Sequence, residues 1–93
     1  MTPEDTTCGW SQQEGVAYEI ALDVLPQLTA AADQQIVRLR ETTTPDHAQI
    51  ATWEERGARW AQRRLDLTPE DTATVQQVLH IDSQILRDLQ ADR

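Results

Sequence analysis

Several residue types are scarce or missing in this 93-residue chain. Cys8 is the only cysteine, which excludes an internal disulfide and fits a reducing cytosol. Phenylalanine, lysine and asparagine do not occur, and because their codons are A/T-rich, we infer a GC-rich bacterial genome. No apolar run approaches the ~20 residues of a membrane span, and the first residues do not resemble a signal peptide. We therefore expect a cytoplasmic protein without membrane association.

Positive charge is also scarce, and it is unevenly placed. The chain has 16 acids against 8 bases, a net charge of -8, and every base is an arginine. No base precedes Arg38, whereas that part of the chain contains Glu4, Asp5, Glu14, Glu19, Asp23 and Asp33. An acidic chain is a poor ligand for nucleic acid, whose binding requires cations that displace counterions. The charge permits a basic protein partner or imitation of nucleic acid itself, and the alternative is a solvated acidic face.

A Thr-Pro-acid phrase occurs three times, as Thr2-Pro3-Glu4, Thr44-Pro45-Asp46 and Thr68-Pro69-Glu70. Each phrase predicts a helix start in which threonine is the cap and proline the first helical residue. Asp71 would complete a capping box with Thr68. No strand pattern appears. We expect an N-terminal arm at 1–10 and one domain at 11–93, with helices at about 12–41, 45–65 and 69–90.

Pro26 lies in the middle of the first predicted helix, where proline removes a hydrogen bond. Two apolar stripes nevertheless keep their helical phase through this position. One contains Ala17, Ile20, Ala21, Val24, Leu28, Ala31 and Leu39, and the other Tyr18, Leu22, Leu25, Ala32 and Ile36. This favours one kinked helix over the alternative, two helices joined near Asp23–Pro26. Two stripes require two neighbours. Short joints then predict an all-α, up-down-up antiparallel three-helix bundle, and dimerisation would cover its overhanging first helix.

The second predicted helix has two tryptophans, Trp53 and Trp60, on one face. Its inner face is expected to contain Ile50, Trp53, Gly57, Trp60, Ala61 and Arg64, with Arg56, Arg59 and Arg63 beside it. Tryptophan and arginine are the residue types most enriched at interface hot spots. The candidate partner-binding residues are therefore Trp53, Arg56, Trp60 and Arg63. The alternative is that both tryptophans are core residues and the arginines are solvated or paired, as Glu55 with Arg59.

A polar layer is predicted inside the bundle. Asp82 falls on the apolar face of the third predicted helix, and Gln35 on that of the first. Counting outward from the joints places both near Trp53, whose indole N–H would donate to the carboxylate. The layer would fix helix register, as buried polar residues do in coiled coils. The alternative is a functional carboxylate with a raised pKa.

Motifs for catalysis and metal binding are missing. His47 and His80 stand outside any Glu-x-x-His or zinc pattern, and Cys8 has no identifiable base. No phosphate loop or nucleophile elbow occurs. We expect no cofactor, no metal and no enzymatic activity. The predicted function is regulatory or accessory binding of another protein, with homodimerisation. The alternatives are a nucleic-acid-related regulator and a DNA-mimic antagonist.

Overall fold

A computed structural model describes residues 12–91 of the chain. All of its regular elements are helical: α2 (Gln12–Arg40), α3 (His47–Asp66), α4 (Thr72–Gln77), the π-helical turn η1 (Val78–Asp82) and α5 (Ser83–Ala91). The last three follow one another without a break and together form the third helix. The prediction of three helices without strands is thus confirmed for residues 12–91. The predicted arm at 1–10, with Cys8 and the Thr2-Pro3-Glu4 phrase, lies outside the described residues.

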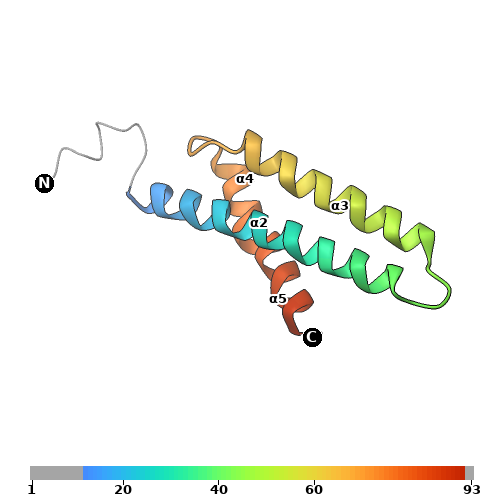
Figure 1. The fold of residues 1–93 in the computed structure, drawn as a ribbon. Coiled ribbons are helices and arrows are strands. Elements are labelled where there is room, and N and C mark those ends of the chain that lie inside the picture. The colour runs from blue at the N-terminus through green and yellow to red at the C-terminus, as the bar shows by residue number, and fades with distance from the viewer. Residues whose placement is uncertain (1–11, 92–93) are drawn as a thin grey trace, which may run out of the picture.

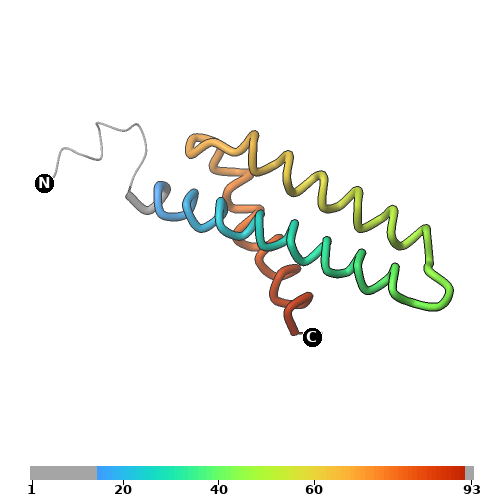
Figure 2. The backbone as a smooth tube through the Cα atoms, viewed as in Figure 1, coloured from blue at the N-terminus to red at the C-terminus, as the bar shows by residue number. Residues whose placement is uncertain are grey.

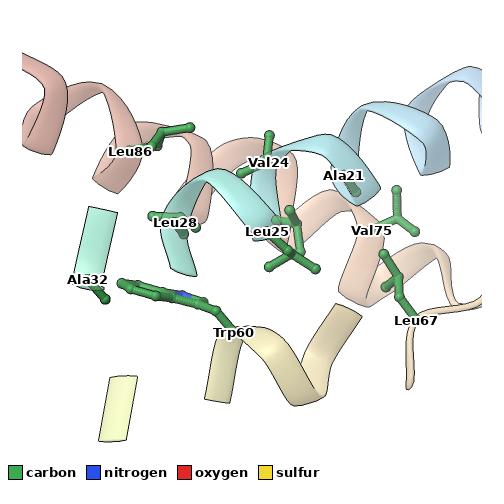
Figure 3. Packing of buried hydrophobic residues seen from close by; sticks show 10 residues of the cluster. Ala21, Val24, Leu25, Leu28, Ala32, Trp60, Leu67, Val75 and Leu86 are labelled. Carbon is green, nitrogen blue, oxygen red and sulfur yellow. The ribbon is translucent and has the colours of Figure 1, made fainter. Parts of the chain in front are cut away.

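The helix α2 is the central element of the fold. It lies side by side with α3 in antiparallel orientation, and the third helix crosses it near the middle (Figures 1 and 2). All three segments of the third helix pack on α2, so α2 has the two neighbours that its two stripes predict. We expected the third helix to run alongside the other two. It crosses instead, because its apolar contacts with α2 are concentrated between Ala21 and Leu28 (Figure 3).

The helix α2 runs without interruption through Pro26. Pro26 is exposed, whereas Leu25 and Leu28 beside it are fully buried, as the phase of the stripes predicts. The Thr29 hydroxyl donates to the Leu25 carbonyl at 3.1 Å, within this same turn. Residues 12–40 are therefore one helix, and the alternative of two helices is wrong.

The two described helix starts are capped by aspartates and not by threonines. Asp46 Oδ1 accepts from the Gln49 amide at 3.1 Å, and Asp71 Oδ1 accepts from the Thr74 amide at 3.2 Å. The predictions that Thr44 and Thr68 are the caps are wrong. A carboxylate carries a full charge that favours the positive end of the helix dipole, so it caps in preference to the hydroxyl. The helices consequently begin two or three residues later than predicted, at His47 and Thr72.

We predict that Asp71→Ala destabilises the chain at neutral pH and loses this effect in acid. Hydrogen bonds from the Thr74 side chain and amide lower the pKa of Asp71 below its ordinary value of 3.8. A lowered folded-state pKa gives stability that is present above the ordinary value and lost as the pH falls through the folded-state value. Thermal unfolding by circular dichroism, from neutral to strongly acidic pH, measures the difference between wild type and variant.

The exposed neighbour Glu70 supplies the control for this prediction, because Glu70→Ala removes a carboxylate that does not cap the helix. Its effect should be small across the pH range. If the difference in thermal stability between wild type and Asp71→Ala stays constant into strong acid, the charge of Asp71 does not contribute to stability.

The core forms where the three helices meet. Leu25, Leu28 and Val78 are fully buried, and Trp60 packs beside Ala32 (Figure 3). Leu67 is also part of this core, although it lies between the second and third predicted helices. It lies in the connection after α3, where the Tyr18 hydroxyl donates to its carbonyl at 3.4 Å. The connection from α3 to the third helix is therefore anchored in the core.

Candidate functional site

Three side chains of α3 form a stacked cluster. The Arg56 Cζ atom lies 4.4 Å from the ring centroid of Trp53 and 5.0 Å from that of Trp60. Arg56 is three residues after Trp53 and four before Trp60, so the helical repeat alone brings the three together. A guanidinium at these distances is attracted by the negative faces of both rings. The two rings therefore hold the Arg56 guanidinium in a fixed position at the edge of α3.

The two tryptophans of this cluster differ in accessibility. Trp60 is only 6% exposed and belongs to the core, whereas Trp53 and Arg56 are partly exposed. The surface that a partner can touch is therefore formed by Trp53 and Arg56. Trp60 supports this surface from inside. The sequence places both rings on one face, but it does not reveal which of them the neighbouring helix covers.

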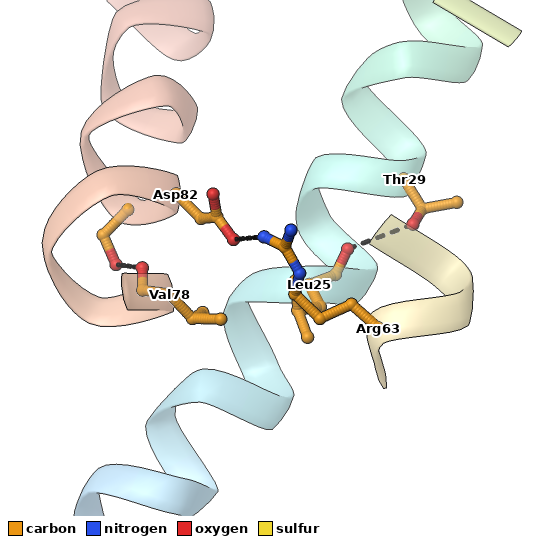
Figure 4. Close-up of polar contacts among 6 residues, drawn as sticks. Leu25, Thr29, Arg63, Val78 and Asp82 are labelled. Atoms are coloured by element: carbon orange, nitrogen blue, oxygen red, sulfur yellow. Dashed lines mark hydrogen bonds and ion pairs between the residues drawn. The ribbon is translucent and has the colours of Figure 1, made fainter. Parts of the chain in front are cut away.

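Arg63, the fourth candidate, is part of an ion pair between α3 and the third helix. Its Nη1 atom donates to Asp82 Oδ2 at 2.7 Å (Figure 4). The Asp82 side chain is 4% exposed and that of Arg63 is 30% exposed. Among residues 15–91, whose side chains the structure describes, every buried side-chain nitrogen or oxygen has a hydrogen-bond partner. A carboxylate this deep requires such a partner, because burial of an unpaired charge is costly.

This ion pair replaces the polar layer that we expected. Asp82 is buried on the third helix as predicted, but it accepts from Arg63 and not from Trp53. Gln35 lies half-buried on α2, and within the described residues no hydrogen bond joins it to Asp82. Our count of levels assumed that the third helix begins at residue 69 and runs alongside α3. Its later start and its crossing of α2 place Asp82 level with Arg63 instead.

Asp82 also ends a π-helical turn. The Ser83 amide donates to the Val78 carbonyl five residues before it, and the Ser83 hydroxyl donates to the same oxygen at 3.2 Å. A π turn widens the helix and changes the direction of the side chains that follow it. The apolar spacing of this segment fits an ordinary α-helix, so the sequence gives no signal for the turn.

The other arginines of α3 are engaged differently. Arg59 pairs with Glu55 one turn before it on the exposed surface, as the alternative interpretation proposed. Arg64 and Ala61 are exposed, so their assignment to the inner face is wrong. The covered arc of α3 is narrower than its sequence pattern indicates. Its buried residues are Ile50, Gly57 and Trp60.

A hollow of about 390 Å³ opens between the C-terminal half of α2 and the N-terminal half of α3. Arg40 and Glu54 pair across this part of the surface at 3.2 Å. Gly57, which we expected on the inner face of α3, is buried. A Cβ atom added to Gly57 would lie 3.4 Å from the Ala32 Cβ, which is an ordinary contact. The hollow is lined by Asp33, Ile36, Val37, Arg40, Trp53, Glu54 and Gly57.

Among residues 15–91, whose side chains the structure describes, no three or more His, Cys, Asp or Glu side chains gather into a group that could hold a metal ion. His80 is exposed, and its Nε2 atom lies 2.9 Å from Gln76 Oε1 on the same helix. In the same part of the chain, no helix combines the length and the apolar character that crossing a membrane requires.

Comparison of the chain with models of known families, with curated proteins and with solved structures finds no match.

Proposed function

We propose that this chain is a non-enzymatic interaction protein of the bacterial cytoplasm, with a regulatory or accessory role. It binds another protein through the exposed edge of α3 formed by Trp53 and Arg56. Trp60 and Arg63 support this edge from the core and from the ion pair with Asp82. The chain acts as a homodimer.

The position of Arg56 over two indole rings carries this proposal. A free arginine side chain loses considerable rotamer entropy when a partner immobilises it. Stacking on Trp53 and Trp60 orders Arg56 before any partner arrives, which lowers that loss. Aromatic and arginine side chains in such rigid positions are typical of the few residues that dominate binding energy.

The charge of α2 indicates the kind of partner. Glu19, Asp23 and Asp33 are all exposed on this helix, within a chain of net charge -8. An acidic surface attracts a basic partner and accelerates its association at low ionic strength. We therefore propose a protein whose basic surface faces the acids of α2, beside a separate surface that accepts the Trp53–Arg56 edge.

We predict that Arg56→Ala weakens binding of the partner by about tenfold or more, the effect of losing a hot-spot residue. The partner is first captured from cells of the source organism, then purified and titrated by calorimetry. The matched control is Arg87→Ala, which removes an exposed arginine on α5 that bonds to Gln84 in its own helix. Equal affinities of wild type and Arg56→Ala would rule out this edge as the contact surface.

The acidic face of α2 supports a second candidate, an antagonist that imitates DNA. Glu19, Asp23 and Asp33 would then stand in for phosphates in front of a DNA-binding protein. A salt titration separates the two. Binding dominated by charge weakens steeply with salt, whereas a tryptophan-anchored contact does not.

A further inference from the structure

The helix α3 has a second, uncovered face in addition to the one that packs on α2. Its residues recur at alternating spacings of three and four, which is the pattern of a helix-packing seam. All are exposed, and Leu65, at 74%, is the most exposed large hydrophobic residue of the described chain. The seam consists of Ala51, Glu54, Ala58, Ala61 and Leu65.

We propose that α3 pairs through this seam with α3 of a second copy in antiparallel orientation. The inference rests on the proposed homodimer and assigns its contact surface. From Glu54 to Leu65 the spacings are four, three and four, so they are the same in both directions. A two-fold axis between Ala58 and Ala61 therefore places each Ala58 opposite the partner's Ala61. Each Leu65 then lies opposite the partner's Glu54.

Two features of the structure fit this pairing. Ala58 and Ala61 are small, which lets two helices approach closely at the axis. Glu54 lines the hollow of about 390 Å³ together with Trp53 and Gly57. Leu65 of the second copy arrives at this hollow and packs on Ile36 and Val37, the aliphatic part of a lining that also contains the charged residues Asp33, Arg40 and Glu54. The most exposed leucine of one copy thus meets the hollow of the other, and the exchange is reciprocal, as a two-fold interface requires.

Charge favours this face over the other apolar residues that a second copy could cover. Two copies of net charge -8 repel each other, so their contact must be locally neutral. Glu54 is the only charged residue of the seam, and Arg40 pairs with it at 3.2 Å. The alternative is the half-exposed pair Val16 and Ile20 on α2. Exposed Asp23 lies on the next turn beside Ile20, where two copies would bring like charges together.

The test is the solution mass of the full chain by sedimentation equilibrium over a concentration series. Wild type is expected to approach twice the chain mass of 10.6 kDa, and Leu65→Glu and Ala58→Glu to remain at 10.6 kDa. The matched controls Ile20→Glu and Ile81→Glu place the same charge on other half-exposed isoleucines and should stay dimeric. Circular dichroism confirms that each variant keeps its helix content, because every substituted residue is exposed.

A monomeric wild type would overturn the inference, and so would a dimer that survives Leu65→Glu. Dissociation by Ile20→Glu alone would assign the contact to α2 and likewise overturn it. The Arg56→Ala binding experiment is independent, because Arg56 stacks on Trp53 and Trp60 outside the seam. A negative result for the dimer therefore leaves the partner surface testable. A negative result for partner binding likewise leaves the dimer testable.

A cross-linking experiment tests the register. Ala58→Cys and Ala61→Cys are each made in a Cys8→Ser background and mixed in equal amounts with oxidised glutathione. The proposed axis brings residue 58 of one copy opposite residue 61 of the other. The mixed disulfide should therefore form faster than either disulfide between identical variants. Equal rates, or faster pairing of identical variants, would contradict the antiparallel register.

Discussion

Replacing Arg63 with methionine is expected to destabilise the fold by about 3 kcal/mol, the effect of breaking a buried ion pair. The substitution keeps much of the side-chain volume but leaves the Asp82 carboxylate, 4% exposed, without its cation. The low dielectric of the core makes an unpaired charge there expensive. Urea unfolding at fixed protein concentration, followed by circular dichroism, measures the loss.

The double variant Arg63→Met, Asp82→Leu separates the ion pair from the packing around it. Removal of both charges is often neutral or even stabilising, so we expect the double variant to recover most of the lost stability. The matched control is Arg59→Met, whose pair with Glu55 is exposed and contributes at most about 0.5 kcal/mol. If Arg63→Met and Arg59→Met destabilise equally, the Asp82 contact does not hold the third helix to α3.

Helix content and burial followed from local patterns in the sequence. The phase of the apolar residues predicted one helix through Pro26, with Leu25 and Leu28 inside. The same reasoning placed Asp82 in the core, because its position on the third helix depends only on nearby spacing. The burial of Leu67 was not predicted, since a residue outside a helix has no helical phase from which its burial can be inferred.

The partner of Asp82 was not predictable in this way. It depends on how the third helix crosses α2, and a crossing angle is set by the packing of many side chains at once. The uncovered seam of α3 was not predicted either, because it depends on how much of α3 the neighbouring helices cover. Ala61 fits the inner face by phase, yet it is exposed because the covered arc extends only from Ile50 through Gly57 to Trp60.

Trp60→Ala is expected to destabilise the fold by about 3 to 5 kcal/mol, the range for truncating a buried aromatic side chain. The loss is a large share of the ~5–15 kcal/mol by which a domain is stable. Trp53→Ala is the matched comparison, because Arg56 lies 4.4 Å from Trp53 and 5.0 Å from Trp60, so each variant removes one stacking ring. Trp53 is partly exposed and Trp60 only 6% exposed, so Trp53→Ala should cost less than half as much.

Urea unfolding of both tryptophan variants provides the measurement, with Arg56→Ala as a third chain that keeps both rings. All three variants lose at least one cation–π contact. The additional loss of stability in Trp60→Ala, relative to the other two variants, therefore reports the burial of Trp60. Equal losses for the two tryptophans would show that Trp60 is no more important to the core than Trp53. The expected difference also decides how binding is tested. Lost binding in Trp60→Ala would reflect unfolding, so the partner surface has to be tested through Arg56 and Trp53.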